Sequence, residues 1–221
     1  MTDFAAARRM MVDGQVRPSD VTDLRLIGAM QDVPRERFVP PAFAQLAYLD
    51  LDVPVNAPGA NQRHLLKPMV LAKLIHAADI RATDIALDVG CATGYSSAVL
   101  ARLAGSVVAL EEDDALARYA DEALSSTGTA SVTVVVGPLA AGWPSQAPFD
   151  VILINGSAET VPKALFRQLK DGGRLVCVFG SGPGCKAMLY RNTGGEVGGR
   201  PIFDAAAPLL PGFAKPRAFA F

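Results

Sequence analysis

From residue 85 onward, short apolar segments alternate with segments whose apolar residues recur at helical spacing. The segment Ile85–Val89 is apolar except for one aspartate, which is typical of a strand covered on both faces of a sheet. The predicted strands are 85–89, 107–110, 132–136, 151–154 and 174–179; the predicted helices are 95–104, 115–124 and 161–169, and a turn is predicted at 171–173. This alternation predicts a doubly wound α/β fold with a mostly parallel sheet and right-handed crossovers.

The first 67 residues show helical spacing that prolines interrupt. Helices are predicted at 4–16, from Leu24 with Thr22 or Asp23 as its cap, and at 41–48, before an irregular stretch at 50–67. Pro68 then begins another helix, because proline is tolerated in the first helical turn. We therefore expect a helical cap and substrate-side loop at 1–67 and a ligand-binding α/β core at 68–221. The cap either simply covers the sheet or also forms a wall of the substrate site.

The C-terminal part of the chain has a different pattern. Ala187–Arg191 and Ala218–Phe221 are predicted strands, and glycines and prolines are frequent between them. An antiparallel pair at the edge of the sheet fits this pattern best. Together with the five strands above, the pair completes a predicted seven-stranded sheet.

The composition restricts the classes of partner. The chain has 221 residues, is 50% hydrophobic and carries a formal net charge of −1. Without a basic tail we expect no nucleic-acid partner. The apolar runs are too short to span a membrane, and no secretory signal is visible at the start, so we expect no membrane partner. Cys91, Cys177 and Cys185 form no CxxC pair, which predicts reduced thiols in the cytoplasm and no metal site.

The most informative stretch lies where the first core strand ends, at Asp88-x-Gly90-x-Ala92-x-Gly94. Small residues let the backbone turn tightly and let a ligand lie directly on it, and a helix follows at once. The spacing differs from the dinucleotide pattern G-x-G-x-x-G, and the absence of a following lysine excludes a phosphate-binding P-loop. Cys91 within the turn is a small filler, since no base stands beside it to activate a thiol.

This turn resembles the first motif of class I S-adenosylmethionine-dependent methyltransferases. The resemblance implies S-adenosylmethionine as cofactor and S-adenosylhomocysteine as product. It also implies that an acid at the end of the second strand binds both ribose hydroxyls, a task that suits the two oxygens of a carboxylate. Glu111 stands there, and Glu112 is the more solvent-facing member of the pair. The implied cofactor-binding residues of the turn and this strand end are Asp88, Gly90, Cys91, Ala92, Gly94, Glu111 and Glu112.

A narrower resemblance extends over roughly residues 8 to 180. The segments that carry it are Gly14-Gln15-Val16-Arg17, Val33–Pro40, Ala47–Asp50, Gly142-Trp143-Pro144 and Gln168–Val176. In this order and spacing they are similar to protein-L-isoaspartate O-methyltransferases. The resemblance implies protein repair by methylation of the α-carboxylate of isoaspartyl residues, with a damaged protein or peptide as partner. It also implies a seven-stranded sheet with an antiparallel pair at one edge.

The chain departs from that family's pattern at three places. Leu66 stands where the family has a serine that helps to hold the substrate carboxylate, and leucine cannot donate a hydrogen bond. Pro138 stands where the family has an acid that contacts the adenine, and we expect Leu139 to pack against the ring instead. Asn155 begins a segment that is more apolar in the family. We include Pro138, Leu139 and Asn155 among the cofactor-binding candidates.

The candidate residues on the substrate side are His64, Leu66 and Lys67. His64 and Lys67 would make a cationic pocket for an anionic substrate, and His64 could serve as a base toward a hydroxyl or amine. The alternative interpretation makes both of them solvated loop residues. No residue receives a certain catalytic role, because a carboxylate is already ionised at neutral pH and needs mainly alignment with the methyl group.

The sequence thus favours an isoaspartyl O-methyltransferase and leaves two alternatives open. One is methyl transfer to another acceptor, such as a small anionic molecule or a different protein carboxylate. The other is a non-catalytic relative that binds S-adenosylmethionine. The sequence leaves the oligomeric state open as well.

Overall fold

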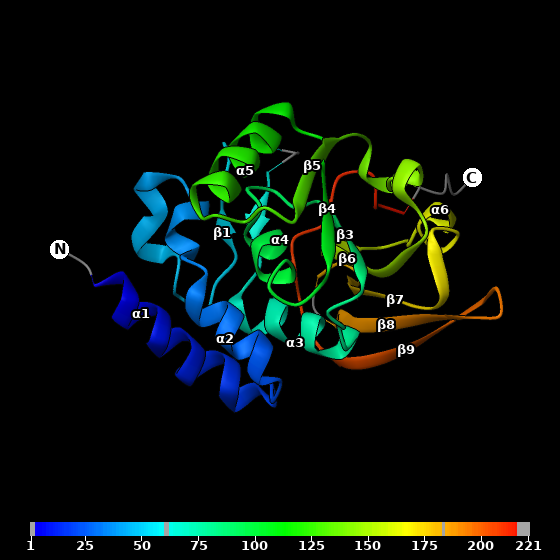
Figure 1. Ribbon diagram of the computed structural model, residues 1–221, viewed down its shortest axis with the longest axis horizontal. Helices are drawn as coiled ribbons and strands as arrows, with labels where there is room; N and C mark the ends of the chain where they lie inside the picture. The colour runs from blue at the N-terminus through cyan, green and yellow to red at the C-terminus, as the bar shows by residue number, and fades with distance from the viewer. Residues whose placement is uncertain (1–2, 60–61, 183, 216–221) are drawn as a thin grey trace, which may run out of the picture.

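The computed structural model describes residues 3–59, 62–182 and 184–215, and its centre is a seven-stranded sheet (Figure 1). The strand order is β5-β4-β3-β6-β7-β8-β9. The strands are β3 Ile85–Val89, β4 Ser106–Glu111, β5 Val132–Val136, β6 Phe149–Ala158, β7 Leu169–Phe179, β8 Lys186–Thr193 and β9 Glu196–Asp204. The first five are parallel, and β8 and β9 are antiparallel to their neighbours. The predicted doubly wound, mostly parallel fold is confirmed.

The edge of the sheet is a β8–β9 hairpin, and the prediction placed its second strand wrongly. β9 lies within the glycine- and proline-rich segment that we had interpreted as a connection. Gly194 (φ +63°) and Gly195 (φ +90°) form the turn between the strands in the left-handed region that short hairpin turns require. These glycines therefore mark the hairpin turn, and Ala218–Phe221 lies outside the described residues.

Helices cover the sheet and form most of the N-terminal extension. They are α1 Phe4–Met11, α2 Leu24–Asp32, α3 Pro68–Ala78, α4 Tyr95–Leu100, α5 Asp114–Ser126 and α6 Lys163–Phe166. The expected helix at 161–169 is wrong in length, because Leu169 instead pairs with Phe149 as the start of β7. The expected turn at 171–173 lies within that strand. Across the described ranges, no helix has the length and apolar character needed to cross a membrane.

Three further segments of the extension have short or irregular elements. α1 continues as a π-helical turn at Val12–Val16, and the predicted helix at 41–48 is a 3₁₀ helix at Pro41–Leu46. The irregular stretch at 50–67 contains two short paired strands, β1 Val53–Pro54 and β2 His64–Leu65.

Two hydrophobic clusters lie on opposite faces of the sheet. Along β3, Ala86 belongs to one cluster, whereas Leu87 and Val89 belong to the other, as the alternation of a strand requires. The first cluster also includes buried residues of α1, α2 and α3, so the N-terminal extension shares its core with the sheet. Figure 1 shows the extension and the β8–β9 hairpin at opposite ends of the molecule.

A buried arginine joins the extension to the helix that follows the glycine turn. Arg35 is fully buried, donates to the carbonyls of Ala47 (2.6 Å) and Leu66 (2.8 Å), and lies 4.6 Å from the ring centroid of Tyr95. A guanidinium over an aromatic face gains cation–π attraction where water is excluded. The position of α4 and its preceding turn therefore depends on the extension.

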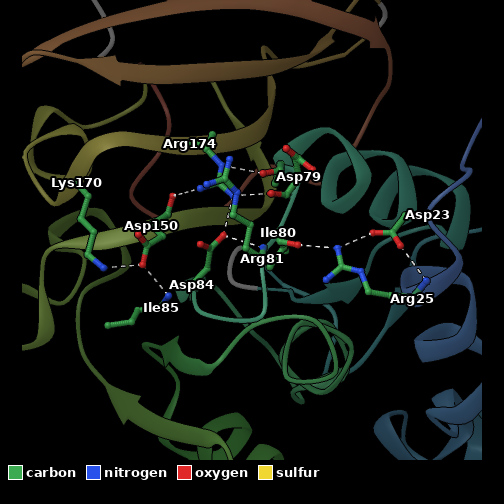
Figure 2. A network of polar contacts seen from close by, with 11 residues as sticks. Asp23, Arg25, Asp79, Ile80, Arg81, Asp84, Ile85, Asp150, Lys170 and Arg174 are labelled. Carbon is green, nitrogen blue, oxygen red and sulfur yellow. Dashed lines mark hydrogen bonds and ion pairs between the residues drawn. The ribbon is translucent and has the colours of Figure 1, made fainter.

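A second polar network joins the end of α3 to the base of the sheet (Figure 2). Arg174 on β7 donates to the carbonyls of Ala78 (2.9 Å) and Asp79 (2.6 Å), and its Nη2 lies 2.7 Å from the Asp84 carboxylate. One buried side chain thus satisfies carbonyls that the helix leaves without partners at its C-terminus. Asp150 extends the network by accepting from Lys170 and from the Ile85 backbone.

Replacing Arg174 by methionine is expected to lower the free energy of unfolding by about 2–4 kcal/mol, because the Asp84 carboxylate and three backbone carbonyls lose a donor. Urea unfolding followed by circular dichroism measures this loss. Lys186→Met is the matched control, since that lysine pairs with Asp204 on the exposed hairpin, where ion pairs contribute little. Equal losses in the two variants would contradict the proposed importance of the network.

Candidate active site

The turn after β3 has a backbone that small residues adopt most easily. Gly90 (φ +78°), Ala92 (φ +53°) and Gly94 (φ +92°) are all in the left-handed region. The N–H groups of Gly90 and Cys91 donate to the Leu110 carbonyl, which holds the turn against the end of β4. Cys91 is fully buried and burial raises the pKa of its thiol, which supports its role as a filler.

Glu111 is the last residue of β4, and its carboxylate is completely buried, with both oxygens accepting hydrogen bonds. One oxygen accepts from the backbone N–H of Ala92 (2.8 Å) and from Arg63 Nη2 (3.0 Å). The other oxygen accepts from the backbone N–H groups of Glu112 (3.0 Å) and Asp113 (3.4 Å). Glu111 therefore connects the glycine turn, the start of α5 and the loop that carries Arg63.

Arg63 is a site residue that the sequence did not reveal. It lies in an irregular segment with no periodicity, and its backbone N–H is held by the Asn56 side chain (2.7 Å) while its carbonyl accepts from Val55 (2.9 Å). The side chain then crosses the turn, because a Cβ atom built on Gly90 would lie 2.5 Å from Arg63 Nη2. The one signal in the sequence that could have indicated Arg63 is a basic residue in the loop before the glycine turn.

A cavity of about 510 Å³ opens beside the Glu111 carboxylate. Its walls come from the end of β4, the turn after β5 and the C-terminal segment. The lining residues are Arg63, Glu111, Glu112, Asp113, Gly137, Pro138 and Pro211. Leu139 is not among them, because its side chain is fully buried in the hydrophobic cluster that also contains Leu87 and Val89.

The segment after β9 crosses the end of the sheet next to this cavity. The carbonyl of Pro208 accepts from Ser157 N–H (2.8 Å), and Leu210 N–H donates back to the Ser157 carbonyl (3.0 Å). Leu210 packs over two glycines, since an added Cβ would lie 2.6 Å from its side chain at Gly156 and 3.2 Å at Gly90. Arg63 and Leu210 together therefore cover the glycine turn.

Asp88 is buried behind the turn. One carboxylate oxygen accepts from Ser96 Oγ and Ser97 Oγ, both at 2.6 Å, and Asn155 Nδ2 donates to the same Ser96 Oγ at 2.8 Å. Burial raises the pKa of Asp88 to about 6, and the two serine hydrogen bonds oppose that rise. Asp88 thus positions the start of α4 and, through Ser96, the Asn155 amide.

The family model for protein-L-isoaspartate(D-aspartate) O-methyltransferases matches residues 8–199. The chain is 42% identical over 189 residues to the protein-L-isoaspartate O-methyltransferase of Methylorubrum populi, which covers 86% of this chain and 85% of that protein. The enzyme of the same name from Koribacter versatilis is 37% identical over 212 residues, covering 95% and 93%. The chain belongs to the protein-L-isoaspartate O-methyltransferase family.

Solved structures of the family share the fold. A protein-L-isoaspartate O-methyltransferase superposes with a TM-score of 0.80 at 23% identity, covering 93% of this chain and 66% of that one. A Plasmodium falciparum protein-L-isoaspartate O-methyltransferase in complex with S-adenosyl-L-homocysteine gives a TM-score of 0.76 at 16% identity, covering 92% and 97%. The sequence resemblance and the expected fold are both confirmed.

The residues that depart from the family pattern lie in different environments. Pro138 lines the large cavity. Leu66 is buried and, with His64 and Asn155, lines a separate cavity of about 10 Å³, which has room for about one water molecule. Lys67 does not line this small cavity, and its backbone N–H donates to Asp52 (2.9 Å).

Of the two substrate-side residues His64 and Lys67, only His64 lines the small cavity. Burial lowers the pKa of His64, which favours the neutral imidazole at neutral pH. Among the described residues, the cation that lies over the glycine turn is Arg63. Within the described residues, no three His, Cys, Asp or Glu side chains are grouped to hold a metal ion.

The pKa of Asp88 predicts a pH dependence of stability. Because the folded state raises this pKa from about 4 to about 6, the folded chain holds the proton more tightly than the unfolded chain. That contribution is present below about pH 4 and is lost as the pH rises through 6. Asp88→Asn keeps the oxygen that accepts from the serines and removes the titration.

The free energy of unfolding of the unmodified chain should therefore fall from pH 4 to 7 by up to about 3 kcal/mol relative to the Asp88→Asn variant. Urea unfolding of both proteins at pH 4, 5, 6 and 7 measures the difference, and all other groups cancel in the comparison. A difference that does not change with pH would show that the folded state does not raise the Asp88 pKa.

Proposed function

We propose that this chain is a cytoplasmic S-adenosylmethionine-dependent O-methyltransferase that methylates isoaspartyl carboxylates in damaged proteins or peptides. The observation that carries the proposal is the buried Glu111 carboxylate at the junction of the glycine turn and the 510 Å³ cavity. The membership of the chain in the isoaspartyl methyltransferase family supports it. The three cysteines are free and buried, which agrees with a reducing compartment.

The residues around the turn are suited to this cofactor. The turn from Gly90 to Gly94 is buried beneath Arg63 and Leu210, and its small residues would let a ligand lie on the backbone once these side chains move. The Glu111 carboxylate would accept from the two ribose hydroxyls. Gly137 and Pro138 would form the wall for the adenine, where proline offers shape but neither charge nor N–H. Asp88 and Asn155 would act behind the turn by fixing its position.

Methyl transfer to a carboxylate requires little acid–base catalysis by the protein. The bound cofactor supplies an electrophilic methyl group on a sulfonium. The acceptor carboxylate has an ordinary pKa near 4 and is ionised at neutral pH. The chain's own residues therefore have to bind both molecules, align the oxygen with the methyl group and exclude water. We propose that residues 1–67 form the acceptor-side cap and residues 68–221 the cofactor-binding core.

One observation favours a second candidate function. Leu66 is buried, where the family's serine would offer a hydroxyl to the substrate carboxylate. The acceptor could therefore be a small anionic molecule or another protein carboxylate, with the same cofactor. His64, beside Leu66 on the small cavity, and Lys67, next in the chain, would then contribute to acceptor recognition.

The two functions are separated by measuring cofactor binding and methyl transfer independently. S-Adenosylhomocysteine binding is measured by calorimetry, and methyl incorporation is measured with a peptide that contains isoaspartate and with its aspartate counterpart. Binding with incorporation only into the isoaspartyl peptide is the expected result. Binding without incorporation would redirect the search to other acceptors, and absence of binding would overturn the cofactor assignment.

Two neighbouring acids provide a matched test of the cofactor site. Glu111→Gln should weaken S-adenosylhomocysteine binding at least about 10-fold, because hydrogen bonds to a buried charge are lost. Glu112→Gln changes an exposed acid on the same cavity and should alter binding by less than about 3-fold. Calorimetry on both variants measures the contrast, and the assignment of Glu111 fails if the two substitutions have the same effect.

A further inference from the structure

Arg63 is a buried cation that occupies the groups to which the proposed cofactor would bind. Its side chain is 4% exposed and its Nη2 lies 3.0 Å from Glu111 Oε2. The same nitrogen lies over the turn, within 2.5 Å of the place where a Cβ on Gly90 would stand. Both groups that it covers are the ones assigned above to the cofactor.

Each oxygen of the Glu111 carboxylate already accepts two hydrogen bonds. Of its four donors, three are backbone N–H groups that the turn and the start of α5 hold in place, at Ala92, Glu112 and Asp113. Arg63 is the only one of the four that can leave by rotating a side chain. Ribose hydroxyls that bind Glu111 would therefore displace the guanidinium.

A displaced Arg63 needs another anion. Among the ion pairs of the described residues, Glu111 is the only partner of Arg63, and a buried charge without a partner is strongly destabilising. Arg63 Nε is buried and also lacks a hydrogen-bond partner there. The proposed cofactor brings its own anion, since its methionine part carries an α-carboxylate. A guanidinium binds a carboxylate through two parallel N–H groups.

We propose that Arg63 is a cofactor-binding residue that exchanges partners: the ribose of S-adenosylmethionine takes Glu111, and Arg63 transfers to the cofactor's α-carboxylate. This inference rests on the proposed function. The exchange keeps the guanidinium paired with a carboxylate in both states, and Glu111 keeps its three backbone donors while it gains the ribose hydroxyls. It also makes tight binding depend on the ligand's carboxylate, because a ligand without one would leave the guanidinium buried and without an anionic partner.

The test compares two ligands that differ only in that carboxylate. One is S-adenosylhomocysteine, and the other is 5′-S-(3-aminopropyl)-5′-thioadenosine, its decarboxylated analogue. Calorimetry with the full chain should show a preference for S-adenosylhomocysteine of at least about 10-fold, the usual size of a charge-assisted hydrogen bond. Arg63→Gln should weaken S-adenosylhomocysteine binding and tighten binding of the analogue, so that the preference falls to within about 3-fold.

Arg63→Lys keeps the charge and should retain most of the preference, which guards against a glutamine variant that fails to fold. Arg102→Gln removes a half-exposed arginine that lies just after the C-terminal end of α4 and pairs with Asp32, and it should leave both affinities unchanged. Thermal unfolding of each variant confirms that it is folded.

The remaining outcomes overturn the proposal. Tighter binding of both ligands by Arg63→Gln would make Arg63 only an obstruction, and equal weakening of both would make it only structural. An unmodified chain that binds both ligands equally would exclude the exchange while leaving the proposed function intact. An unmodified chain that binds neither would overturn the proposed function and the exchange together.

Discussion

The carboxylate of Glu111 is the point at which the separate parts of this site meet. It ends β4, accepts from the turn after β3 through Ala92, and accepts from the start of α5 through Asp113. A buried carboxylate must have its charge compensated. Here the compensation comes from backbone N–H groups and from Arg63, so the geometry of the turn, the loop and the helix start all depend on one side chain.

The N-terminal extension acts on the same turn from the other side. Arg35 holds the extension together and lies against Tyr95, the first residue of α4. Thr93 in the turn donates to the carbonyl of Phe38 in the extension. The extension therefore does more than cover the sheet, because its contacts help to set the backbone on which the cofactor would lie. This joint construction explains why the extension and the core share one hydrophobic cluster.

The family resemblance and the departures from it have a common physical consequence. According to the sequence resemblance, Leu66 and Pro138 stand where the family has a hydroxyl and a carboxylate, and neither side chain can form the corresponding hydrogen bonds. The structure places two other groups at the glycine turn, the guanidinium of Arg63 and the side chain of Leu210. In the proposed exchange, recognition of the cofactor depends on a buried charge whose partner changes with what occupies the site.

The sequence by itself determined the sheet, the glycine turn and the acid at the end of β4, because strand periodicity and small-residue spacing are local properties. The length of α6 and the position of β9 required the tertiary structure, since strand pairing decided both. The burial of Leu139 was likewise decided by packing. Arg63 and Leu210 reach the turn from segments about 27 and 120 residues away, and no local pattern records a contact over such a separation.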